Sequence, residues 1–83
     1  MTGLFFVNRN HEEAIKHLEA CVRAKIASPS PYLQLSVIYR SYGMLEEEMN
    51  TLEQGIASVD PNNKNIYELK ERLNKVKLLI NQS

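Results

Sequence analysis

The stretch that decides the fold is SPSPYLQLSVIYRSYGMLEEEMNTLEQG, Ser28 to Gly55. Its first half repeats apolar and aromatic side chains at steps of three and four residues, the period of a helix with one buried face. These residues are Tyr32, Leu35, Val37, Ile38, Tyr39 and Tyr42. Ser30 can cap the free amides of such a helix, and Pro31 suits its first position, where a missing amide costs nothing. Gly43 can take the left-handed conformation that stops a helix, so the pattern predicts a helix from about 31 to 42.

The residues after Gly43 predict two further helices. Three glutamates, Glu46 to Glu48, fall in the first turn of the next segment, where the helix dipole favours negative charge. This helix runs from about 45 to 59 and has the apolar stripe Leu45, Met49, Leu52 and Ile56. The run DPNN at 60–63 breaks it. The last helix is expected from about 65 to 80, with the inward residues Ile66, Leu69, Leu73, Val76 and Leu79 or Ile80.

The segment before Ser28 predicts the first helix. Asn10 can cap it, and Glu13 at the third helical position completes a capping box. Its apolar stripe consists of Ala14, Ile15, Leu18, Cys21, Val22 and Ile26. No strand-like alternation of apolar and polar residues competes with these patterns. We therefore expect one all-α domain, residues 1–83, in which helices joined by short turns pack as antiparallel hairpins.

The chain also repeats itself. A shift of 34 residues lays Leu18 on Leu52, Val22 on Ile56, Tyr32 on Ile66, Leu35 on Leu69, and Tyr39 on Leu73. This period resembles that of the tetratricopeptide repeat, a helix–turn–helix unit. The motif of that repeat is also resembled, by Tyr32-x-x-Leu35-Ser36-x-x-Tyr39, then Glu48-x-x-x-Leu52, then Pro61. The resemblance covers about residues 5–80, of which 31–63 form a complete unit. It implies a right-handed stack of about four helices.

Two positions depart from the pattern of that family. Ser36 replaces its glycine and Glu48 replaces its small alanine, at places where the helices cross closely. A glutamate at such a crossing must direct its carboxylate outward, so we expect the carboxylate of Glu48 to reach solvent and the crossing to be loose. The first helix of the preceding unit survives only as the fragment TGLFFVN.

Composition limits the possible functions. The 83 residues include 43% hydrophobic and 24% charged side chains, which is typical of a globular chain. Ten basic and ten acidic residues cancel, so net charge gives no preference for nucleic acid or for an anionic membrane. Residues 45–58 carry glutamates and no basic residue, whereas 64–80 are mainly basic, and we interpret them as two solvated helix faces that attract each other. With Cys21 as the single cysteine, no signal peptide and no membrane-length stretch, we expect a soluble cytoplasmic protein.

The sequence offers no arrangement of residues that is typical of an active site. His11 and His17 do not share a helix face, so they cannot form a paired metal site. Cys21 lies on an apolar stripe, and the sequence places no histidine near it that would activate a thiol. The three consecutive glutamates point in different directions around their helix, and the glycines form no phosphate-binding loop. We expect no enzyme activity, no cofactor and no metal.

Binding is therefore the expected function. Tetratricopeptide proteins hold a peptide or a partner helix on the concave face built from the first helix of each pair. The resemblance places Leu33, Val37, Arg40 and Ser41 on this face from one helix, and Tyr67, Glu71 and Asn74 from the last. Members of the family that grip a terminal carboxylate carry Lys and Asn where this chain has Leu33 and Val37, so we expect an apolar or amphipathic segment of a protein partner instead.

Size suggests that the chain also associates with itself. About three repeat units are usually needed for stability, and this chain has one complete unit. The apolar run Leu4, Phe5, Phe6 and Val7 either folds back as a short cap or docks on another chain, and we expect the second, as a homo-oligomer. Two alternatives stay open: a small chaperone for one client protein, and a helical nucleic-acid-binding domain that uses the basic last helix.

Overall fold

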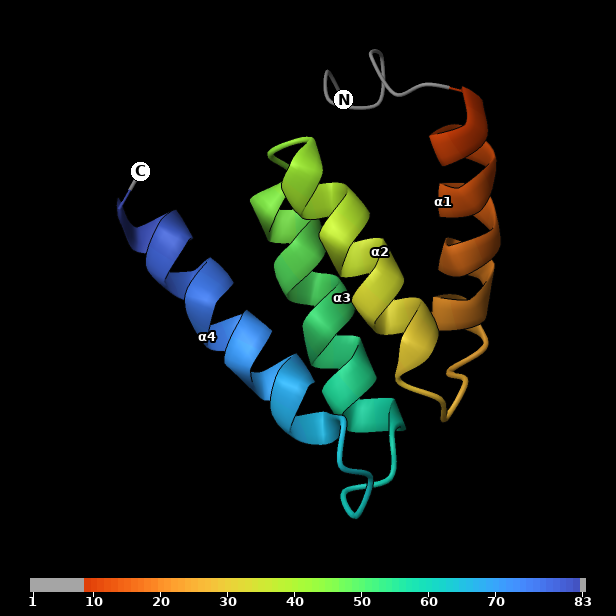
Figure 1. Ribbon diagram of the computed structural model, residues 1–83, viewed down its shortest axis with the longest axis vertical. Coiled ribbons are helices and arrows are strands. Elements are labelled where there is room, and N and C mark those ends of the chain that lie inside the picture. The colour runs from red at the N-terminus through yellow and green to blue at the C-terminus, as the bar shows by residue number, and fades with distance from the viewer. Residues whose placement is uncertain (1–8, 83) are drawn as a thin grey trace.

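The computed structural model describes residues 9–82, which form four helices. These are α1 (Arg9–Arg23), α2 (Ser30–Ser41), α3 (Leu45–Ser58) and α4 (Ile66–Gln82). Consecutive helices run in opposite directions, and α2 and α3 lie between α1 and α4 (Figure 1). Residues 9–82 contain no strand, so the all-α prediction is confirmed. None of these four helices is long and apolar enough to cross a bilayer.

The turn between α2 and α3 forms as the glycine predicts. Gly43 has a φ of +72°, in the left-handed region. Its amide donates a hydrogen bond to the carbonyl of Arg40 at 3.0 Å, and the amide of Met44 donates to the carbonyl of Tyr39 at 2.9 Å. These two bonds satisfy carbonyls that the end of a helix would otherwise leave free. The helix stop at Gly43 is therefore confirmed.

Both predicted caps at helix starts are wrong. Helix α1 already includes Arg9, so Asn10 lies inside the helix and not at its cap. Helix α2 has Pro29 at its N-cap, where it makes no side-chain cap, and Ser30 as its first residue. The amide of Ser30 donates to Oγ of Ser28 at 3.5 Å. The hydroxyl of Ser30 instead accepts a hydrogen bond from Nε2 of Gln34 at 2.9 Å. Apolar periodicity locates a helix but does not fix the residue at which its first turn closes.

Helix α1 ends with a left-handed residue that is not glycine. Lys25 has a φ of +55°. The amide of Lys25 donates to the carbonyl of Val22 at 3.0 Å, and that of Ile26 donates to the carbonyl of Cys21 at 3.3 Å. Ile26 thus lies beyond the helix and is 37% exposed, so its predicted place in the buried stripe of α1 is wrong. The carbonyl of Ile26 accepts a hydrogen bond from the Tyr32 hydroxyl at 2.7 Å, which ties this turn to α2.

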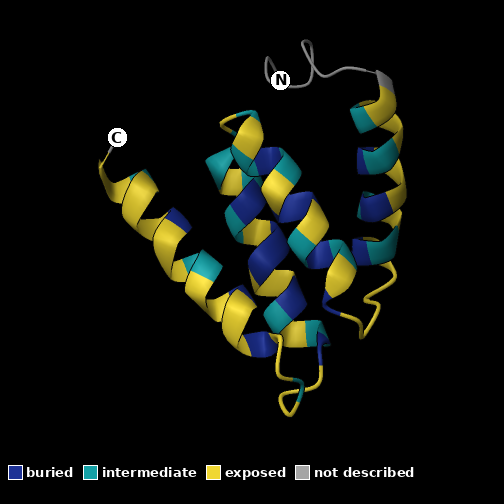
Figure 2. Ribbon diagram, in the orientation of Figure 1, coloured by how far each residue is buried: buried dark blue, intermediate teal, exposed yellow. Residues whose placement is uncertain are grey.

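The core lies along the faces where α2 and α3 meet their neighbours (Figure 2). Tyr39 and Leu52 are buried, as the hairpin prediction requires. The closest approach is at Gly55 of α3, where an added Cβ would lie 2.8 Å from Cγ of Tyr32. The other buried apolar side chains are Ile15, Leu18, Val22, Leu35, Val59, Ile66, Leu69 and Val76. Glycine at 55 is therefore required by packing between the two helices, a role that periodicity did not indicate.

The charged faces of α3 and α4 do not pair. Within residues 9–82, no ion pair joins these two helices. The ion pairs of α4 lie inside it, between Arg72 and Glu68 at 3.8 Å and between Lys75 and Glu71 at 3.4 Å. Among the described residues, the attraction expected between the acidic and basic segments therefore does not take the form of ion pairs.

Candidate functional site

Two adjoining hollows lie between α2 and α4, each with a volume of about 360 Å³. They share Glu68 and Arg72, and together they form what we call the α2–α4 groove. Helix α2 lines it with Leu33, Gln34, Val37, Ile38 and Arg40, and α4 with Glu68, Glu71, Arg72 and Lys75. Four of the seven residues predicted for a binding face thus share one depression: Leu33, Val37, Arg40 and Glu71.

The other three predicted residues do not line this groove. Ser41 follows Arg40 on α2 and donates its hydroxyl to the carbonyl of Ile38 at 2.7 Å. Tyr67 is 75% exposed, and Asn74 is exposed as well. Helix α4 turns a different side toward α2, the side of Glu68, Arg72 and Lys75. Of the three α4 residues predicted for the binding face, Glu71 lines the groove, whereas Tyr67 and Asn74 lie outside it.

One end of the groove is apolar. Leu33 and Ile38 are half-buried, and Val37 is 46% exposed between them. An aliphatic side chain that entered this end would cover carbon surface that α2 leaves in water, which favours binding by the hydrophobic effect. This end can accept one or two apolar side chains of a partner.

The other end of the groove is charged. Arg40, Arg72 and Lys75 line it together with Glu68 and Glu71. Arg72 and Lys75 already have acidic partners on α4, and neither pair is buried. Exposed pairs of this kind contribute little and exchange readily with other partners. The charged end can therefore form polar contacts at the edge of an apolar ligand.

Arg40 is held in place by a buried carboxylate. Its Nε donates to Oε1 of Glu48 at 2.7 Å. Glu48 is 0% exposed, so the expectation that its carboxylate points outward is wrong. The carboxylate stays inside the α2–α3 crossing because the guanidinium of Arg40 reaches it there, and a buried charge requires such a partner.

This pairing also leaves polar groups unused. Oε2 of Glu48 is buried and has no hydrogen-bond partner among residues 9–82. A guanidinium carries five N–H donors in a planar fork, and Glu48 takes only one of them. The side chain of Arg40 is 34% exposed and lines the groove. Its remaining donors are therefore oriented by Glu48 for a polar group in the groove.

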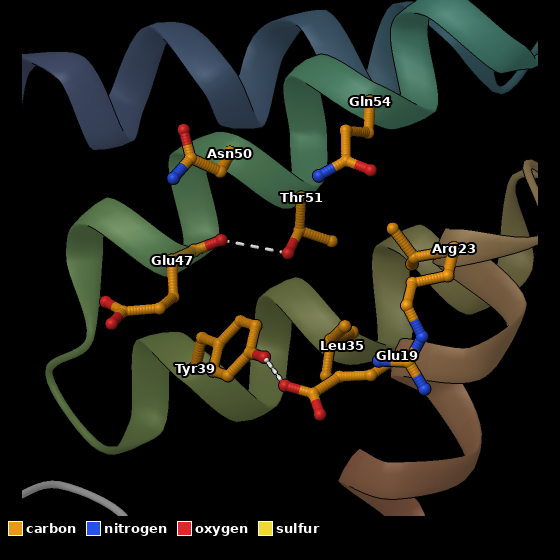
Figure 3. A pocket seen from close by; sticks show the side chains of 9 residues that line it. Glu19, Arg23, Leu35, Tyr39, Glu47, Asn50, Thr51 and Gln54 are labelled. Carbon is orange, nitrogen blue, oxygen red and sulfur yellow. Dashed lines mark hydrogen bonds between the residues drawn. The ribbon is translucent and has the colours of Figure 1, made fainter. Parts of the chain in front are cut away.

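A second pocket, of about 250 Å³, lies where α1, α2 and α3 meet (Figure 3). Its floor is apolar, with Val22, Leu35 and Tyr39, and its rim is polar. The rim residues are Glu19 and Arg23 from α1 and Glu47, Asn50, Thr51 and Gln54 from α3. No sequence pattern indicated this pocket, because its rim combines polar residues from two helices that only the fold brings together.

Tyr39 brings a buried phenol to this pocket. Its hydroxyl donates to Oε2 of Glu19 at 2.5 Å. Burial raises the pKa of the phenol well above its usual value near 10, and the hydrogen bond to Glu19 raises it further. A phenol held protonated in this way is a structural hydrogen-bond donor and cannot act as a base near neutral pH.

Neither histidine is isolated on the surface. Nδ1 of His11 and the hydroxyl of Tyr42 are hydrogen-bonded at 2.6 Å, which links α1 to the end of α2. Nε2 of His17 lies 3.9 Å from Sγ of Cys21. The expectation that no histidine lies near Cys21 is wrong, because residues four apart are neighbours on a helix. Within residues 9–82, no group of three or more acidic, histidine or cysteine side chains is arranged to hold a metal ion.

The predicted self-association run Leu4, Phe5, Phe6 and Val7 lies outside the residues that the structure describes.

Comparison with protein-family models, with curated proteins and with solved structures found no match to this chain.

Proposed function

We propose that this chain is a non-catalytic protein-interaction module of the tetratricopeptide type, which binds an apolar or amphipathic segment of a partner in the α2–α4 groove. The observation that carries this proposal is the composition of the groove. Its apolar end, at Leu33 and Val37, directly adjoins a charged end that contains an oriented arginine, Arg40. An amphipathic segment presents the same two kinds of surface side by side.

Each end of the groove has a distinct role in this function. The apolar end supplies affinity, since fully burying an exposed aliphatic side chain is worth about 1.5–3 kcal/mol and Val37 is still 46% exposed. The charged end supplies orientation, because Glu48 fixes the guanidinium of Arg40 and so restricts where an acidic or carbonyl group of the partner can bind. A right-handed stack of hairpins, as in the resembled family, places such a groove on the inner face of its curve.

The polar groups outside the groove support binding over catalysis. The phenol of Tyr39 keeps its proton and is bonded to Glu19, and the imidazole of His11 is bonded to Tyr42. These groups hold α1 against α2. A nucleic-acid-binding function of α4 is less favoured, because two of its cations, Arg72 and Lys75, already have acidic partners.

Selection from a random-peptide display library tests the proposal. Enriched peptides should carry aliphatic side chains next to an acidic residue, and their affinity is then measured by fluorescence anisotropy. Val37→Asp should weaken binding by about tenfold or more, since about 1.4 kcal/mol corresponds to tenfold. Glu53→Gln, an exposed position on α3, serves as the matched control and should leave affinity unchanged.

Two results would contradict the proposal. Peptides that bind Val37→Asp as well as they bind the unaltered protein would place the binding site elsewhere. Binding of a DNA duplex in a mobility-shift assay, lost steeply as salt rises and abolished by neutralising Lys70 and Lys77, would instead support the nucleic-acid function.

A further inference from the structure

The 34-residue shift relates whole helices as well as single residues. It carries α1 onto 43–57, the span of α3, and carries α2 onto 64–75, within and just before α4. Helix α1 therefore corresponds to α3, and α4 corresponds to α2. Within residues 9–82, only α2 is followed by its pairing helix. Among the described residues, 9–82, no α3-like helix follows α4 and no α2-like helix precedes α1.

The α2–α3 hairpin shows which side of α1 has no pairing helix among residues 9–82, and we call it the open side of α1. The α3 residues Glu48, Thr51 and Gly55 are all buried in that hairpin. The shift carries them onto Ala14, His17 and Cys21 of α1. Their spacing of three and four residues places them on one face, and His17 is exposed there while the other two are half-buried. Ala14 and Cys21 are small, so a second helix can approach this face closely.

The same comparison identifies an open side on α4. Leu33, Ser36 and Arg40 of α2 correspond to Tyr67, Lys70 and Asn74 of α4. Ser36 is fully buried and the other two α2 residues are partly buried. Their counterparts on α4 are all exposed, Tyr67 by 75%, and Leu78 further along the same side is 60% exposed. Figure 2 shows α4 exposed over most of its length.

Charged residues of opposite sign lie on the open side of α4 and beside the open side of α1. Lys70 and Lys77 belong to the open side of α4, and Glu13 adjoins the open side of α1. All three are exposed, and none of them is in an ion pair within residues 9–82. In an antiparallel pair, Lys77 near the end of α4 falls beside Glu13 near the start of α1. This complementarity favours a second copy of the chain as the occupant.

We infer that the open side of α4 in one copy packs against the open side of α1 in a second copy, and rebuilds between chains the hairpin that α2 and α3 form within one. Helices α1 and α4 lie at opposite edges of the molecule, so one copy can use both sides at once (Figure 1). The interface joins two different surfaces and is heterologous, so copies add head to tail. The mean mass should rise steadily with concentration.

The observed hairpin supplies a direct test. Arg40 and Glu48 form its buried ion pair, and the shift carries these positions onto Asn74 of α4 and Ala14 of α1. Asn74→Arg and Ala14→Glu are made in separate proteins. Sedimentation velocity of the 1:1 mixture should show association on the order of tenfold tighter than that of the unaltered protein. Ala14→Glu alone should associate more weakly, because it leaves a carboxylate unpaired in the interface.

Two further variants keep the test decisive. Ala57→Glu makes the same change on the exposed side of α3, so mixing it with Asn74→Arg should produce no gain. Tyr67→Glu alters a residue that is 75% exposed, so the fold should survive, and association should fall by about tenfold or more.

Three outcomes would overturn the inference. The mixture containing Ala14→Glu could associate no better than the one containing Ala57→Glu. Ala14→Glu could stay monomeric, melt at a lower temperature and not associate when Asn74→Arg is added. The chain's own Leu4–Val7 run would then occupy the open side of α1. Self-association that Tyr67→Glu leaves intact would place the interface elsewhere. None of these results depends on peptide binding in the groove, so this inference and the proposed function are tested separately.

Discussion

Arg40 and Glu48 allow the interior of the hairpin to be tested quantitatively. Their contact is 2.7 Å long, with Glu48 fully buried and the side chain of Arg40 34% exposed. Removing one partner of a buried pair typically costs about 3–5 kcal/mol, because a charge remains buried without compensation. Water reaches Arg40 in part, so we expect Arg40→Met to lower the free energy of unfolding by about 2–3 kcal/mol. A chain of this size should then melt at least about 10 °C lower.

The double variant distinguishes pairing from simple packing. Arg40→Met combined with Glu48→Met removes both charges and the unpartnered Oε2. Apolar residues of similar volume often replace a buried pair without loss, so we expect the double variant within about 1 kcal/mol of the unaltered protein. Urea denaturation followed by circular dichroism measures all of these values. Lys16→Met removes an exposed ion pair to Glu12 as the control and should cost less than about 0.5 kcal/mol. Additive losses in the double variant would refute the reasoning.

Three other substitutions test the turn, the helix crossing and the buried phenol. Gly55→Ala gains about 1 kcal/mol of helix propensity. Its Cβ would lie 2.8 Å from Cγ of Tyr32, however, and overpacking costs about 1–3 kcal/mol. Urea denaturation should therefore show a net loss of stability. A more stable protein would contradict this. Gly43→Val should lower stability by about 1–2 kcal/mol through the φ of +72° alone, since the space around Gly43 is open. An unchanged melting curve would show that this backbone conformation does not matter. Tyr39→Phe removes a donor to Glu19 and should cost about 1–2 kcal/mol at neutral pH. Because the folded state raises the pKa of Tyr39, the phenol's contribution to stability is complete below about pH 10 and is lost as the pH rises above it. When the free energy of unfolding is measured against pH, it should therefore fall less steeply above about pH 10 for Tyr39→Phe than for the unaltered protein.

The sequence by itself determined the four helices and the stop between α2 and α3. Both depend on local interactions: the period of apolar residues marks each helix, and Gly43 takes a positive φ at little cost wherever it occurs. Burial of Tyr39 and Leu52 followed for the same reason, because they lie at the centre of their stripes. The neighbourhood of His17 and Cys21 could also have been predicted from their four-residue spacing.

Only the tertiary structure decided what happens at the borders of those stripes. Whether Glu48 points inward depends on the guanidinium of Arg40, which another helix supplies. Whether Asn74 lines the groove depends on the side that α4 turns toward α2. The need for glycine at 55 arises from the ring of Tyr32 on the facing helix. A helical period tells which direction is buried on average, but the depth of a border residue is set by how closely the neighbouring helix approaches, and that distance is a property of the pair of helices.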